Sequence, residues 1–209
     1  MLIQTYDETY FYEIYTSLLE VQLLKNKIIL ISGYCATGKS TFSHNLANRY
    51  KLPCFNKDTL KEVIGEGFGA ENTDVHKKNS TVTFSLMLHI AEKFLQTGQI
   101  CILESNFKKS ESVHIESLLA KYDCECLTFL FKGDLDAIYD RYKERDRLGE
   151  RHWVHSSAGE NREGFIQGHL YAGLGDVAIG QTITVDATVF EDVDDAKLFN
   201  IAENFLTSQ

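Results

Sequence analysis

The sequence predicts an α/β domain in which a parallel sheet carries helices on both faces. Short apolar runs rich in β-branched residues alternate with amphipathic segments along the whole chain, the pattern that parallel strands joined by crossover helices produce. One such run, residues 25–33, leads through a glycine-rich loop directly into an amphipathic segment. The length of 209 residues suits one sizeable domain, so residues 1–209 are expected to form a single unit.

The first half of the chain predicts a helical N-terminal extension and three strands with their crossover helices. The extension is residues 1–24, in which aromatic and aliphatic residues recur at helical spacing over 8–24; this stripe packs on the core or forms a homodimer contact. The strands are expected in KNKIILISG, KLPCFNKD and QICILESN. Helices are expected over 39–51, from Asp58 to the glycine-rich stretch 65–70, and over 75–97.

The second half predicts two more strands and four helices. The strands are CECLTFLF and QTITVDAT, and the helices cover 110–121, GDLDAIYDRYKERDR, about 158–171, and 191–207. The helix that begins near residue 134 is capped by Asp134 or Asp136, since aspartate is a favoured N-cap residue. Five strands in one parallel sheet are therefore expected.

Composition narrows the class of protein. The net charge of −9 and the pI near 5.2 disfavour broad electrostatic binding of nucleic acid. No run approaches the 18 or so apolar residues of a membrane span, and the acidic N-terminus is unlike a secretory signal. Five cysteines make no disulfide framework and are expected as reduced thiols. These features predict a cytoplasmic protein that does not enter a membrane.

The segment GYCATGKST fits the phosphate-binding pattern G-x-x-x-x-G-K-[ST], and it stands between a strand and a helix as that pattern requires. Glycine at both ends lets consecutive N–H groups turn inward around a phosphate, and the following helix adds its positive dipole. The pattern predicts a site for ATP and Mg²⁺. The expected nucleotide-binding residues of this loop are Gly33, Tyr34, Cys35, Ala36, Thr37, Gly38, Lys39, Ser40 and Thr41.

Lys39 is expected to contact the β- and γ-phosphates, and the Ser40 hydroxyl to ligate Mg²⁺. Glu104 ends the third strand, where an acid holds Mg²⁺ directly or through its waters; binding of the second substrate is the alternative. Asp58 follows the second strand at the same edge of the sheet, where it can accept a proton from a hydroxyl as a phosphoryl group is transferred. Its alternative role is to cap the helix that begins there.

Arginines are concentrated in a second motif. Four of the six, Arg141, Arg145, Arg147 and Arg151, lie within eleven residues on an otherwise acidic chain. Arginine forks stabilise the charge that develops on a transferred phosphoryl group, so residues 139–156 are expected to form a lid. Arg145 and Arg151 are the expected catalytic arginines; a solvated helix paired with neighbouring acids is the alternative. His152 and His155 are expected in a hinge or substrate contact rather than at a metal.

On these residues the chain resembles the P-loop kinases of the nucleoside-monophosphate-kinase-like type, in the group with zeta toxins and chloramphenicol phosphotransferases. The resemblance covers residues 27–207 and rests on GYCATGKST, FNKDTLKE, ILESNF, RYKERDRLGERHWVH and ITVDAT. It implies the strand order 2-3-1-4-5, Asp58 as base, Arg141 near the nucleotide, and Arg145 and Arg151 on phosphates. It also implies that residues 186–188, beginning with Asp186, approach the adenine.

The expected activity is therefore transfer of the γ-phosphoryl group of ATP to a hydroxyl of a small molecule such as a sugar, nucleoside or antibiotic. A phosphorylated acceptor is disfavoured, because no arginine lies between Arg49 and Arg141 to bind it. The alternatives are a toxin-like kinase of a nucleotide-sugar, a nucleotide-binding ATPase switch that works through partners, and a nucleic-acid end kinase.

Overall fold

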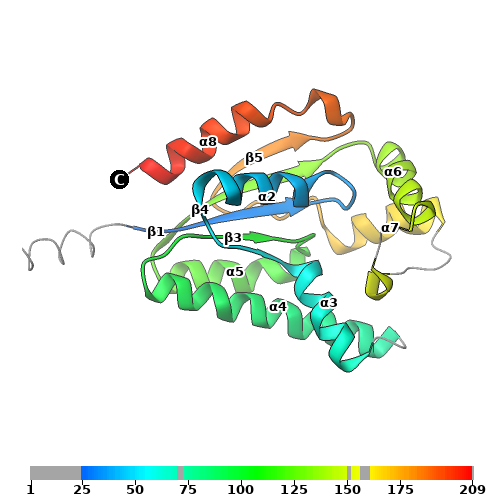
Figure 1. Ribbon diagram of the computed structural model, residues 1–209, viewed down its shortest axis with the longest axis horizontal. Coiled ribbons are helices and arrows are strands. Elements are labelled where there is room, and N and C mark those ends of the chain that lie inside the picture. Colours follow the sequence, from blue (N-terminus) through cyan, green and yellow to red (C-terminus); the bar gives the residue numbers. More distant parts are fainter. Residues whose placement is uncertain (1–24, 70–72, 150–151, 156–160, 209) are drawn as a thin grey trace, which may run out of the picture.

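A computed structural model describes residues 25–69, 73–149, 152–155 and 161–208 and places five parallel strands in one sheet. The strand order is β2-β3-β1-β4-β5, as expected. The strands are β1 Asn26–Gly33, β2 Cys54–Asn56, β3 Cys101–Glu104, β4 Cys124–Lys132 and β5 Gln181–Asp186. Because all five run the same way, their carboxyl ends meet at one edge (Figure 1).

Helices cover both faces of the sheet (Figure 1). Helices α2 (Lys39–Tyr50) and α8 (Asp195–Thr207) lie on one face, and α4 (Thr73–Gln96) and α5 (Lys109–Lys121) lie on the other. At the carboxyl edge are α3 (Lys57–Phe68), α6 (Leu135–Arg147), α7 (Arg162–Ala172) and the 3₁₀ turns η1 (Trp153–His155) and η2 (Phe190–Asp192).

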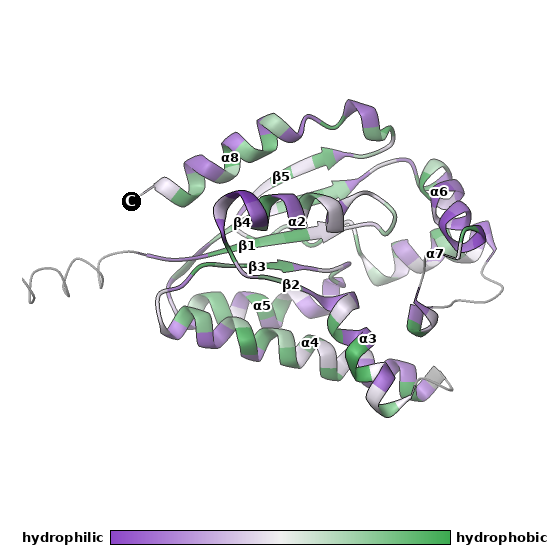
Figure 2. Ribbon diagram, viewed as in Figure 1, coloured by the Kyte–Doolittle hydropathy of each residue, from purple (hydrophilic) through white to green (hydrophobic). Residues whose placement is uncertain are grey.

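The central strand β1 explains why its sequence is a continuous apolar run. Ile28 and Leu30 pack into the core under α4 and α5, while Ile29 and Ile31 pack under α2 and α8. All four are fully buried, because successive side chains of a strand point to opposite faces and both faces are covered. Figure 2 shows this arrangement, with hydrophobic central strands between helices of mixed hydropathy.

The start of the last helix differs from the prediction for a local reason. The last helix begins at Asp195 rather than 191, because the Asp194 side chain accepts the N–H of Lys197 at 3.0 Å and caps it there. Helix α3 ends at Phe68, inside the glycine-rich stretch where its end was expected. The predicted helix over residues 8–24, with its dimer contact, lies outside the described residues, as do residues 158–160 of the penultimate helix.

Two further expectations concern the cysteines and membrane-spanning helices. The cysteines are free, and burial raises the pKa of Cys101 and Cys126 to about 12, so these thiols behave as small apolar groups. Among the described residues, no helix has the length and apolar character that crossing a membrane requires.

Candidate functional site: a phosphate loop between an acid and an arginine helix

The loop between β1 and α2 depends on glycine at its first position. Gly33 has a φ of +122°, and a Cβ there would lie 1.9 Å from the carbonyl oxygen of Phe131 on β4. The N–H of the next residue, Tyr34, donates to that same oxygen at 2.9 Å. A side chain at position 33 would push the loop off the sheet, so glycine is required here for both conformation and close approach.

At its other end the loop leads into helix α2, whose N-terminus has no side-chain cap. Ala36 and Gly38 have positive φ values of +51° and +84°, which turn the chain into α2. Gly38 is the N-cap residue, and glycine has no side chain to accept the first N–H groups of the helix. These N–H groups and the positive end of the helix dipole therefore face the loop, where an anion would be stabilised.

Lys39 is held inside the loop and is 4% exposed. Its ammonium donates to the carbonyl oxygen of Tyr34 and lies 3.4 Å from the Thr37 hydroxyl. Burial lowers the pKa of Lys39, and the negative charges of Glu104 and, to a smaller degree, Asp58 oppose that effect. The Thr37 hydroxyl donates to the Tyr34 carbonyl at 2.7 Å, so this residue fixes the shape of the loop.

Ser40 and Glu104 come together as the sequence predicted. Sheet register places Glu104 beside Ile31 on one side and Asn56 on the other. The Ser40 hydroxyl donates to Glu104 Oε2 at 3.2 Å, and the Asn56 amide donates to the same oxygen. Glu104 is 4% exposed, and burial raises its pKa to about 7 against the opposing effect of Lys39. A hydroxyl and a carboxylate side by side are ligands that suit Mg²⁺.

Asp58 lies in the first turn of α3, but it does not cap the helix. The cap is Asn56, whose side-chain oxygen accepts the N–H of Thr59 at 3.0 Å. The alternative role of Asp58, that of N-cap, is therefore wrong, because the cap lies two residues earlier. Its carboxylate instead lines a cavity of about 240 Å³, here called the Asp58 cavity, together with Lys39 and Ser40.

A second cavity of about 480 Å³, here called the Phe190 cavity, adjoins the first. It is lined by the loop, by Thr41 on α2, and by Arg141 and Arg145 on α6. The Arg141 guanidinium lies 4.1 Å from the centre of the Phe190 ring and donates to the Ala187 carbonyl at 2.6 Å. The guanidinium thus lies over one face of the Phe190 ring, and both are planar groups of the kind on which a nucleobase can stack.

The predicted lid is described in part. Arg145 lines both cavities, whereas Arg147 pairs with Glu144 at 2.6 Å on the exposed face of α6. Arg151 lies outside the described residues. Asp186 does not line either cavity; its carboxylate accepts the N–H of Thr188 at 2.9 Å and holds the turn after β5.

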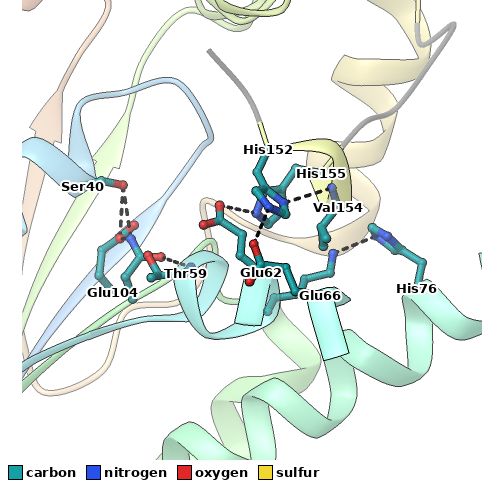
Figure 3. A network of polar contacts seen from close by, with 11 residues as sticks. Ser40, Thr59, Glu62, Glu66, His76, Glu104, His152, Val154 and His155 are labelled. Carbon is teal, nitrogen blue, oxygen red and sulfur yellow. Dashed lines mark hydrogen bonds and ion pairs between the residues drawn. The ribbon is translucent and has the colours of Figure 1, made fainter. Parts of the chain in front are cut away.

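Two carboxylate–imidazole pairs join α3 to η1 and to the residue just before it, as Figure 3 shows. His155 Nε2 lies 3.0 Å from Glu62 Oε1, and His152 Nε2 lies 3.3 Å from Glu66 Oε1. Between them Val154 packs on α3 so closely that a Cβ on Gly65 would lie 2.5 Å from its Cγ2 atom. The histidines thus contact α3, and no group of three metal-binding side chains occurs in the described part of the chain.

Three residues of the site were not predicted. Asn56 carries a readable signal, since asparagine before a helical segment is a frequent N-cap. Glu62 carries a weaker one, because it lies one helical turn after Asp58 and so on the same face of α3. Phe190 carries none, because a single aromatic residue in a loop has no characteristic spacing.

No protein-family model matches the sequence, and no curated protein sequence matches it. Solved structures do match. A crystal structure of a candidate kinase from Chloroflexus aurantiacus aligns with a TM-score of 0.73 at 25% identity, over 88% of this chain and 97% of that one.

More distant matches share the fold. A gluconokinase from Sinorhizobium meliloti aligns with a TM-score of 0.53 at 17% identity, over 87% of this chain and 98% of that one. The tunicamycin resistance protein of Deinococcus radiodurans aligns with a TM-score of 0.56 at 16% identity, over 88% and 98%. The five-stranded order and the surrounding helices are those of P-loop kinase-type folds.

Proposed function

We propose that this chain, which has the fold of the P-loop kinases, transfers the γ-phosphoryl group of ATP to a hydroxyl of a small molecule. The observation that carries the proposal is the sharing of residues between the two cavities. Lys39, Ser40 and Arg145 line both of them, and Asp58 lines only the cavity away from Phe190. A phosphoryl group at the shared residues would therefore have a nucleotide on one side and an acceptor beside a carboxylate on the other.

Each residue has a distinct role in this reaction. The acceptor oxygen forms a bond to the γ-phosphorus as the bond from phosphorus to the β,γ-bridging oxygen breaks, and the acceptor proton passes to Asp58. Lys39 and Arg145 stabilise the charge on the transferring oxygens. Arg141 and Phe190 hold the base of the nucleotide.

Ser40 and Glu104 are the residues that would hold Mg²⁺, and their adjacency at 3.2 Å fits this use. Bound there with ATP, Mg²⁺ would neutralise charge on the β- and γ-phosphates. The Asn56 amide keeps the Glu104 carboxylate oriented toward Ser40.

The test is ADP release from ATP and Mg²⁺ in the presence of a panel of sugars, polyols, nucleosides and aminoglycosides, with mass spectrometry of the product. Asp58→Asn is expected to lower kcat by about 10²- to 10⁴-fold, the usual contribution of a general base, and to leave ATP affinity unchanged. Asp123→Asn, at the exposed turn before β4, is the matched control. ATP binding without stimulation by any hydroxyl compound would overturn the proposal and favour a nucleotide-binding switch.

A further inference from the structure

The part of the Asp58 cavity away from the glycine-rich loop is built from hydrogen-bonding side chains. Carboxylates come from Asp58 and Glu62, an amide from Asn106, and imidazoles from His152 and His155. Among the described residues that line this cavity, lysine and arginine are represented by Lys39 and Arg145 alone, and the proposed reaction assigns both to the phosphoryl group. Of the imidazoles, that of His155 already pairs with Glu62. The described lining therefore offers an anionic acceptor two carboxylates and no lysine or arginine beyond Lys39 and Arg145, which disfavours such an acceptor.

The size of this cavity limits the acceptor. Its volume of about 240 Å³ is below the range of about 300–1,000 Å³ that is typical of drug-sized ligand pockets. Part of that volume adjoins Lys39 and Ser40, where the γ-phosphoryl group would lie. Tyr142 is the one phenylalanine, tyrosine or tryptophan among the described lining residues, and it is 6% exposed, so the smaller imidazole rings of His152 and His155 are the other surfaces on which a nucleobase could stack.

Glu62 is placed to bind a second hydroxyl of the same acceptor. It follows Asp58 by four residues on α3, so the two carboxylates lie on one face of the helix with Cβ atoms about 5–6 Å apart. One oxygen of Glu62 is occupied by His155 at 3.0 Å. A carboxylate has about four acceptor positions, so Glu62 can take a further hydroxyl while His155 fixes its orientation.

We propose that the acceptor is a compact, uncharged polyol, such as a monosaccharide, a sugar alcohol or a cyclitol, and that Glu62 is the residue that selects it. One hydroxyl is placed against Asp58 for transfer, and a neighbouring hydroxyl donates to Glu62. This inference rests on the proposed kinase activity and adds the chemical class of the acceptor. It also makes Glu62 an acceptor-binding residue rather than only a partner of the lid.

The chain contains its own control for this role. Glu66 follows Glu62 by one further turn and pairs with His152, the residue just before the 3₁₀ turn η1, but it does not line the cavity. The Glu66 side chain is 64% exposed and that of Glu62 is 32% exposed. Replacing either glutamate removes one contact between α3 and the segment 152–155, whereas only replacement of Glu62 removes a group that faces the acceptor.

The experiment has two arms. In the first, transfer is measured with glucose, glucitol, ribose and myo-inositol, with gluconate, which has a carboxylate where glucitol has a hydroxymethyl group, and with the nucleosides of the panel above. At least one uncharged compound is expected to exceed gluconate in kcat/KM by tenfold or more. In the second, with that compound, Glu62→Ala is expected to raise the acceptor KM by about tenfold or more and to leave the ATP KM unchanged, because a hydrogen bond to a charged group is lost. Glu66→Ala is expected to change the acceptor KM by less than about twofold.

The outcomes separate this inference from the activity on which it rests. Preference for gluconate, or transfer confined to nucleosides, would overturn the acceptor class and leave the kinase intact. Equal effects of Glu62→Ala and Glu66→Ala would show that both glutamates only dock η1, and would overturn the role of Glu62. Transfer to none of the hydroxyl compounds would overturn the kinase itself. Thermal melting of both variants checks that each is folded.

Discussion

Glu104→Gln is expected to make the protein more stable and less active. Burial holds the pKa of Glu104 at about 7 instead of the ordinary 4.5, so the folded state binds this proton more tightly than the unfolded state does. Stability therefore falls as pH rises from 4.5 to about 7 and stays lower above that range. Each unit of difference in pKa is worth about 1.4 kcal/mol, so the ionised carboxylate costs about 3 kcal/mol at alkaline pH.

Glutamine removes that cost and keeps the local hydrogen bonds. Its side-chain oxygen, in the place of Glu104 Oε2, can accept from both the Asn56 amide and the Ser40 hydroxyl, which lies 3.2 Å from that atom. The gain in the free energy of unfolding is expected to be larger near pH 8 than near pH 5 by about 2 kcal/mol, because the wild-type carboxyl is mostly protonated at the lower pH. At the same time kcat with Mg²⁺ and ATP should fall, since a neutral amide binds a divalent cation less well.

The assay is urea unfolding of wild type and variant at both pH values, with Glu116→Gln on the exposed face of α5 as the control. Because the two proteins share all their other titrating groups, the effects of those groups on stability cancel when the proteins are compared at the same pH. A gain of the same size at both pH values would refute the reasoning, because it would show that the added stability does not depend on the ionisation of Glu104. An unchanged kcat would refute the assignment of this residue to the metal.

Two further substitutions test other parts of the structure. Phe190→Ala is expected to raise the KM for ATP by about 5- to 30-fold with little change in kcat, because it removes the ring that lies 4.1 Å from the Arg141 guanidinium. Steady-state kinetics are the measurement. An unchanged KM would show that the nucleobase does not bind in the Phe190 cavity. Lys57→Met is expected to lower the free energy of unfolding by about 3–5 kcal/mol, because it leaves Glu111 without its buried partner at 2.6 Å. Adding Glu111→Leu to this variant should recover most of the loss. Urea unfolding measures both effects. A loss below about 1 kcal/mol for the single variant would contradict the buried pair.

The sequence predicted the parts of the site that are encoded locally or by strand ends. The phosphate loop needs only its own glycines, Lys39 and Ser40, together with a strand before it and a helix after it, so its pattern is complete within nine residues. Asp58 and Glu104 could be placed together because Glu104 ends one strand and Asp58 follows another, and the carboxyl ends of parallel strands share one edge.

The parts that could not be predicted depend on contacts between distant segments. The Glu62–His155 pair joins a helix near the start of the chain to a 3₁₀ turn beyond α6, and no local spacing encodes that contact. Phe190 was expected to lie just before a helix, but the cap at Asp194 shortens that helix and leaves the ring on a short turn beside Arg141. In both cases tertiary packing, which periodicity does not report, decides the position.

The pairing of β1 has a consequence for how the protein folds. Ile28 lies in register with Cys101 on one side and with Cys126 on the other, so the strand that carries the glycine-rich loop finds its partners only after loops of roughly 70 and 100 residues have closed. The loop also relies on the Phe131 carbonyl of β4 for its shape. A nucleotide can therefore bind only after most of the sheet has assembled, so it would stabilise the finished fold by mass action without guiding the early steps of its formation.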